Sequence, residues 1–123
     1  MVLKRVLDTN AVLYLLGGKL AQSFPVGQYF ISVISEMELL SYPFLDESAQ
    51  AKIEGFLSEV TVVGLTEEVK SLAIRLRRQH SLKLPDAIVA ATALSLGASL
   101  LTNDSKLLQL PGLPSQALEL KEG

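Results

Sequence analysis

Four acidic residues stand where the predicted secondary structure changes, and they are the strongest candidates for chemistry. Asp8 ends the first predicted strand, and Glu38 lies about one turn after the second. Asp104 follows the fourth strand in the run LLTND, and Asp86 comes after Pro85 at the start of an apolar helix. Clustered carboxylates suit hard ions such as Mg²⁺ or Mn²⁺, whereas a chain with no Cys and one His is poorly equipped for zinc. Such ions can activate a water and stabilise charge during phosphodiester displacement.

Each acid also has a structural explanation. Asp8 and Asp104 suit helix N-caps, worth about 1 kcal/mol each, and Asp86 suits the positive end of a helix dipole. Ser35 and Glu38 match the S-x-x-E capping box. Taken singly, the structural explanation is favoured. Taken together, four carboxylates at one edge of a sheet would repel one another and either bind protons or recruit cations. The metal hypothesis therefore depends on a fold that gathers them.

The elements that must position these acids are predicted by apolar runs that alternate with amphipathic stretches. Strands are expected at residues 2–7, 29–34, 61–65 and 98–102, with a possible edge strand at 116–120. Helices are expected at residues 11–16, 35–40, 46–59, 66 onward, 85–97 (with Pro85 first) and 104–110. This alternation predicts one α/β domain over residues 1–123, with a mainly parallel sheet of about five strands flanked by helices on both faces.

Composition narrows the class of protein further. A hydrophobic fraction of 49% and a mean hydropathy of +0.36 favour a dense core with both faces of the sheet covered. No apolar run approaches the roughly 18 residues that cross a bilayer, and the opening MVLKRVLDTN lacks a signal core. The absence of Cys suits a reducing compartment. We therefore expect a cytoplasmic protein with no membrane association.

The charge of the chain constrains any nucleic-acid hypothesis. The net charge is -2 and the pI is near 5.4, whereas proteins that grip phosphates usually carry excess Lys and Arg. Metal ions or a local basic patch would then have to attract RNA. The segment RRQHSLK, residues 77–83, is the candidate patch, although cations also suit the C-terminal end of a helix.

Four segments resemble the PIN-domain family in order and spacing, over practically the whole chain: VLDTNAVLYLL, ISVISEMELLSYP, LKLPDAIVAATALSLGASLLTND and LLQLPGL. The resemblance implies a parallel sheet flanked by helices and a metal-dependent nuclease centre. Its catalytic and metal-binding acids would be Asp8 of D-T-N, Glu38 of S-x-x-E-L, Asp86 of P-D-A-I and Asp104 of T-N-D. Glu36 would lie outside the site, because residues two apart point to nearly opposite sides of a helix.

Hydroxyl and amide groups flank two of these acids, and they could orient metal-bound carboxylates or water from behind. They are Thr9, Asn10, Thr102 and Asn103, which could equally be ordinary turn and cap residues. Some family relatives carry a further acid after T-N-D, where this chain has Ser105, Lys106 and Leu107. We therefore expect one metal ion, or two completed by the substrate.

The small size, with no fused domain, resembles the VapC-type toxins of this family. That resemblance implies an Mg²⁺- or Mn²⁺-dependent endoribonuclease that hydrolyses RNA phosphodiester bonds as the toxin of a type II toxin–antitoxin pair. It also implies a homodimer held inactive by a cognate antitoxin protein. The alternative is a catalytically idle PIN fold that binds RNA or protein. Nucleotide binding is disfavoured, because the chain has no G-x-G-x-x-G or P-loop sequence.

Overall fold

The computed structural model describes residues 3–122, and its centre is a five-stranded parallel sheet. The strand order is β3-β2-β1-β4-β5, and every neighbouring pair is parallel. The strands are β1 (Lys4–Leu7), β2 (Gln28–Ser32), β3 (Thr61–Val63), β4 (Ser99–Leu101) and β5 (Ser115–Gln116). The predicted α/β class and parallel sheet are confirmed. The start of the first predicted strand, residue 2, lies outside the described residues.

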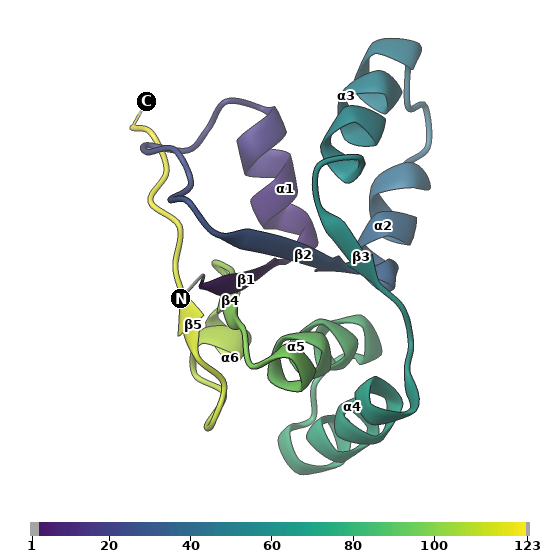
Figure 1. The fold of residues 1–123 in the computed structure, drawn as a ribbon, viewed down its shortest axis with the longest axis vertical. Helices are drawn as coiled ribbons and strands as arrows, with labels where there is room; N and C mark the ends of the chain where they lie inside the picture. The colour runs from purple at the N-terminus through teal and green to yellow at the C-terminus, as the bar shows by residue number, and fades with distance from the viewer. Residues whose placement is uncertain (1–2, 123) are drawn as a thin grey trace.

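Helices cover both faces of the sheet, as predicted. They are α1 (Thr9–Leu16), α2 (Val33–Leu40), α3 (Glu47–Leu57), α4 (Glu67–His80), α5 (Leu84–Leu96) and α6 (Ser105–Leu108). Figure 1 shows α1, α2 and α3 above the sheet and α4 and α5 below it. Over residues 3–122, no helix is long and apolar enough to cross a membrane.

Two hydrophobic cores result, because successive side chains of a strand point to opposite faces. In β1, Val6 belongs to the core between the sheet and helices α4 and α5, and Leu7 belongs to the core between the sheet and helices α1 and α2. Neighbours in β4 behave in the same way, with Leu100 on the first side and Leu101 on the second. Strands β1 and β4 thus contribute side chains to the cores on both faces of the sheet.

Helix α5 is the buried central helix that its apolar sequence predicts. Residues 87–93 are all buried, and four of them are alanines that let α5 lie close to the sheet and to α4. The helix begins at Leu84, so Pro85 is its second residue rather than its first. It ends at Leu96, and its C-cap is Gly97, whose φ of +64° suits glycine.

The start of α2 differs from the prediction. Strand β2 ends at Ser32 instead of Ile34, and Ser32 caps α2 by accepting a hydrogen bond from the Ile34 backbone N–H at 3.1 Å. Ser35 is therefore inside the helix, where its buried hydroxyl has no hydrogen-bond partner among the described residues. The predicted Ser35–Glu38 capping box is wrong, because the cap overrides the β-propensity of the run YFISVI.

The C-terminal segment also differs from the prediction. Strand β5 contains only Ser115 and Gln116, and the chain then leaves the sheet instead of continuing as a strand to 120. Leu120 forms an antiparallel bridge with Leu20, and the Lys121 N–H donates to the Lys19 carbonyl at 2.9 Å. The last residues are therefore fastened to the loop that follows α1.

Candidate functional site

The four predicted acids line one cavity at the carboxyl ends of the central strands. The cavity has a volume of about 150 Å³ and is lined by Asp8, Thr9, Asn10, Glu38, Tyr42, Pro85, Asp86, Val89 and Asp104. Asp8 follows β1 directly, and Asp104 comes three residues after β4. Glu38 is carried by α2 and Asp86 by the first turn of α5. The shared edge of parallel strands thus brings together residues up to 96 positions apart, from 8 to 104.

Asp8 is the most enclosed of these acids, with 9% of its surface exposed. Its Oδ1 accepts from the Ala11 backbone N–H at 2.8 Å, which makes it the N-cap of α1, and its Oδ2 accepts from the Thr102 hydroxyl. Burial raises the pKa of the Asp8 carboxyl; these two hydrogen bonds oppose the rise, and the charges of Asp104 and Glu38 add to it. The Asp8 side chain therefore both caps α1 and lines the acidic cavity.

Thr102 joins two of the acids. Its fully buried hydroxyl donates to Asp8 Oδ2 and accepts from the Asp104 backbone N–H at 3.0 Å. Asp104 in turn caps α6, since its Oδ1 accepts from the backbone N–H groups of Lys106 and Leu107 at 2.9 and 3.1 Å. Within the described chain, no hydrogen bond involves Asp104 Oδ2.

Glu38 is exposed and reaches the cavity from α2. The Thr9 hydroxyl donates to Glu38 Oε1 at 2.8 Å, which ties α2 to the first residue of α1. Glu36 does not line the cavity, although it lies only two residues earlier. Tyr42 lines the cavity and was missed from the sequence. Tyr42 lies two residues beyond the end of α2 at Leu40, so helical spacing gave no signal for it.

Asp86 is half-buried, and its surroundings are negatively charged. Burial raises the pKa of its carboxyl, Asp104 adds to the rise, and Lys83 opposes it. Across residues 3–122 the only ion pair joins Lys70 to Glu67 on α4, so none of the four acids has a paired cation. The cavity therefore concentrates negative charge without a protein counter-ion.

The donor set matches a hard divalent cation in chemistry. Its ligands would be carboxylate oxygens, which Mg²⁺ and Mn²⁺ prefer. In the part of the chain that the structure describes, no three acidic or histidine side chains converge closely enough to grip an ion as they stand. Binding would therefore need side-chain rotation, or waters and substrate oxygens in the remaining positions, which Mg²⁺ commonly keeps.

The flanking polar residues fall into two groups. Thr9 and Asn10 line the cavity, and Thr102 supports it from behind. Asn103 is turned away to the C-terminal segment: its Oδ1 accepts from the Leu118 N–H at 2.6 Å and its Nδ2 donates to the Leu118 carbonyl at 3.2 Å.

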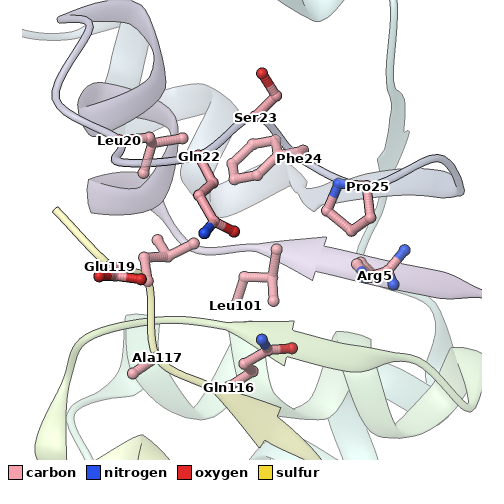
Figure 2. Close-up of a pocket in the computed structure, with 11 residues that line it drawn as sticks. Arg5, Leu20, Gln22, Ser23, Phe24, Pro25, Leu101, Gln116, Ala117 and Glu119 are labelled. Carbon is pink, nitrogen blue, oxygen red and sulfur yellow. The ribbon is translucent and has the colours of Figure 1, made fainter. Parts of the chain in front are cut away.

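A second cavity, of about 200 Å³, lies over β1, β4 and β5 beside the C-terminal segment. Figure 2 shows Arg5, Leu101 and Gln116 on the strands, Gln22 on the loop and Glu119 on the C-terminal segment. The Arg5 guanidinium lies 5.9 Å from the centre of the Tyr29 ring. This cavity has one carboxylate in its lining, so the acidic cavity is the stronger candidate for metal chemistry.

The sequence profile of the PIN domain matches residues 5–113, a span that contains all four acids. The chain belongs to the PIN-domain family. Among curated proteins, no sequence matches this PIN domain.

Solved structures share its fold. A chain of VapBC2 from Rickettsia felis, bound to a DNA fragment from its promoter, matches with a TM-score of 0.80 and 21% identity over 95% of this chain and 100% of the other. A toxin–antitoxin complex from Klebsiella pneumoniae matches with a TM-score of 0.75 and 26% identity over 89% and 94%. DNA-bound VapBC from Salmonella typhimurium matches with a TM-score of 0.78 and 22% identity, over 94% of this chain and 98% of the other. This PIN domain is thus similar to chains of VapBC toxin–antitoxin complexes.

Proposed function

We propose that this PIN domain is an Mg²⁺- or Mn²⁺-dependent endoribonuclease, the toxin of a type II toxin–antitoxin pair. The observation that carries the proposal is the single cavity lined by Asp8, Glu38, Asp86 and Asp104 with no paired cation within residues 3–122. A cation would offset the negative charge gathered there, above all at Asp8 and Asp86, where burial and the neighbouring carboxylates raise the pKa. Structural similarity to toxin–antitoxin complexes supports the biological role.

The proposed roles follow from how each side chain is held. Asp8, Asp86 and Asp104 would hold the metal, and Glu38 would bind it or position water. When bound, the metal supplies an activated water for attack on the RNA phosphodiester and stabilises the developing charge. Asp8 keeps a fixed orientation through Ala11 and Thr102, yet an ionised carboxylate has about four acceptor sites, so two remain for a ligand.

The hydroxyls of Thr102 and Thr9 orient the acids rather than react. Thr102 sets the spacing of Asp8 and Asp104, and Thr9 limits the rotation of Glu38. Cleavage would leave 5′-phosphate and 3′-hydroxyl ends. Because Ser105 and Lys106 follow Asp104 in place of a further acid, one protein-held ion, with any second completed by RNA, is the mechanism we propose.

The decisive experiment compares RNA cleavage by the wild type and by Asp8→Asn in Mg²⁺ or Mn²⁺. We expect the substitution and EDTA each to abolish cleavage. The matched control is Asp46→Asn, because Asp46 is an exposed N-cap of α3 outside the cavity that accepts from Ala49 N–H at 2.7 Å. Cleavage that survives EDTA or Asp8→Asn would sink the metal–carboxylate mechanism. A wild type that binds RNA but cuts none would favour the idle-module alternative.

The proposed partners and cellular setting need separate measurements. We propose a cytoplasmic homodimer that a cognate antitoxin inhibits. Light scattering on the purified chain reports its oligomeric state, and a monomer at all concentrations would contradict the dimer. A small open reading frame directly upstream, whose product suppresses cleavage when co-purified, is the expected antitoxin.

A further inference from the structure

The basic residues of this acidic protein are concentrated in one stretch. Residues 69–85 contain five of the 11 Lys and Arg residues and none of the 13 Asp and Glu residues. The five are Lys70, Arg75, Arg77, Arg78 and Lys83. Lys70 pairs with Glu67 at 2.6 Å, and within residues 3–122 none of the other four makes an ion pair. The stretch ends at Pro85, which lines the acidic cavity together with the next residue, Asp86.

The turn between α4 and α5 leads from these cations to that cavity and carries Lys83. Ser81 adopts a left-handed φ of +54°, and its N–H closes α4 by donating to the Arg77 carbonyl at 3.1 Å. Leu82 is buried, which anchors the turn in the core. Lys83 then stands exposed, two residues before Pro85, which lines the acidic cavity. A firmly held turn thus carries positive charge to the rim of the site.

Lys83 is poorly explained by the local structure. It occupies the N-cap of α5, where Ser, Thr, Asp or Asn is preferred, and within the described chain its side chain makes no cap hydrogen bond. A cation there is also unfavourable, because the N-terminal end of a helix carries partial positive charge. Arg77 and Arg78 are different, since they lie in the last turn of α4, where cations are favoured. Attraction to the nearby Asp86 carboxylate offsets part of the cost at Lys83, which places the Lys83 charge on the side of the acidic cavity.

We propose that Lys83, with Arg77 and Arg78, forms a phosphate-binding strip that holds the RNA backbone next to the acidic cavity. The inference rests on the proposed function for the identity of the polyanion. A cavity with four carboxylates repels the phosphates that flank the scissile bond, and unpaired cations nearby would help a bound metal ion to offset that repulsion. The strip would supply them on the segment that leads directly into Asp86.

The test measures binding of a short fluorescent single-stranded RNA in EDTA, so that no cleavage is required. Each lost phosphate contact lowers the salt slope by about 0.7, which is about 5-fold in affinity at about 0.1 M salt. We expect Lys83→Ser to weaken binding by about that factor and the triple variant Arg77→Gln/Arg78→Gln/Lys83→Gln by roughly 100-fold. Arg77→Lys/Arg78→Lys should keep most of the affinity, because the charge remains.

Two controls separate this role from charge and from stability. The triple variant Lys19→Gln/Lys52→Gln/Lys121→Gln removes the same charge from exposed residues elsewhere, and it should bind RNA far better than the strip variant. Lys83→Ser installs a preferred N-cap, so it should raise the melting temperature while it weakens RNA binding. A purely structural lysine would not move these two readouts in opposite directions.

Three results would overturn the strip: unchanged RNA affinity in the strip variants, an equal loss in the control triple variant, or no RNA binding by the wild type. Unchanged RNA affinity would indicate that these cations bind an acidic protein partner or only stabilise the end of α4. RNA binding that depends on the strip, in a chain that cleaves no RNA with Mg²⁺ or Mn²⁺, would uphold the strip and reject the proposed function.

Discussion

The side-chain amide of Asn103 binds the backbone of Leu118 at both its N–H and its carbonyl, at 2.6 and 3.2 Å. Asn103 lies between Thr102 and Asp104, so this pair of hydrogen bonds fastens the C-terminal segment to the loop that carries two residues of the acidic site. The same segment bonds to the loop after α1 through Lys121 and Lys19. The Asn103 side chain therefore holds the C-terminal segment against the loop that follows β4.

Loss of this amide should release the C-terminal segment. We expect Asn103→Ala to lower the free energy of unfolding by about 1–2 kcal/mol and to speed hydrogen exchange at the Leu118 and Lys121 amides. Asn103→Asp keeps the acceptor for the Leu118 N–H, so its free energy of unfolding should lie between those of the wild type and Asn103→Ala. Gln79→Ala, at an exposed position on α4, serves as the control. Unchanged exchange in Asn103→Ala would contradict the clamp.

Without metal, the stability of the protein should depend on the protonation of Asp8. Folding raises the pKa of this carboxyl above its ordinary value of 3.8. The stability that it contributes is therefore full below that value and is lost as the pH rises through the folded-state pKa. In EDTA at neutral pH, we expect Asp8→Asn to melt a few degrees higher than the wild type, with the difference shrinking in acid.

Asp46→Asn is the matched control for that comparison, because it alters an exposed N-cap and should change the melting temperature little. Mn²⁺ should reverse the order, since an ion bound only by the folded wild type stabilises it by about 2.7 kcal/mol at 100 times the dissociation constant. An Asp8→Asn variant that gains as much as the wild type from Mn²⁺ would contradict the metal role of Asp8.

The hydrogen bond from Thr9 to Glu38 should matter more for activity than for stability. Both ends of this 2.8 Å bond are accessible to solvent, so its removal costs little folding free energy. Groups that orient a metal ligand typically change affinity or activity by about 10- to 100-fold when lost. We expect Thr9→Val to reduce RNA cleavage at least 10-fold on that basis and Thr9→Ser to restore it. Cleavage by Thr9→Val at the wild-type rate would contradict a role of Thr9 in orienting Glu38.

Ser32 and Ser35 should respond in opposite directions to substitution by alanine. Ser32→Ala removes the N-cap of α2 and should cost about 1 kcal/mol of stability. Ser35→Ala removes a buried hydroxyl with no partner among the described residues, so it should stabilise the protein by about 1 kcal/mol. Denaturant titration measures both. A large loss of stability in Ser35→Ala would restore the capping box expected from the sequence.

Local sequence was sufficient for the class of fold and for the identity of the elements. Strong periodicity and end signals predicted α5, whose apolar residues and terminal Gly97 need no distant partner to be recognised. Parallel strands joined by helices then have few topologies, so the acids after β1 and β4 were expected at one edge. Family resemblance selected Glu38 over Glu36, and the lining of the cavity agrees with that choice.

Tertiary structure alone decided which partner each polar group takes. Thr102 donates across 94 residues to Asp8, and Asn103 turns to Leu118 instead of the acids, because both depend on where distant strands and the C-terminal segment lie. The exact start of α2 was also beyond local propensity, since Ser32 and Ser35 are both plausible caps. In the structure the Ser32 hydroxyl accepts from the Ile34 N–H, whereas the Ser35 hydroxyl has no partner among the described residues. Sequence thus determined which groups could do chemistry, and long-range packing determined which of them face the cavity.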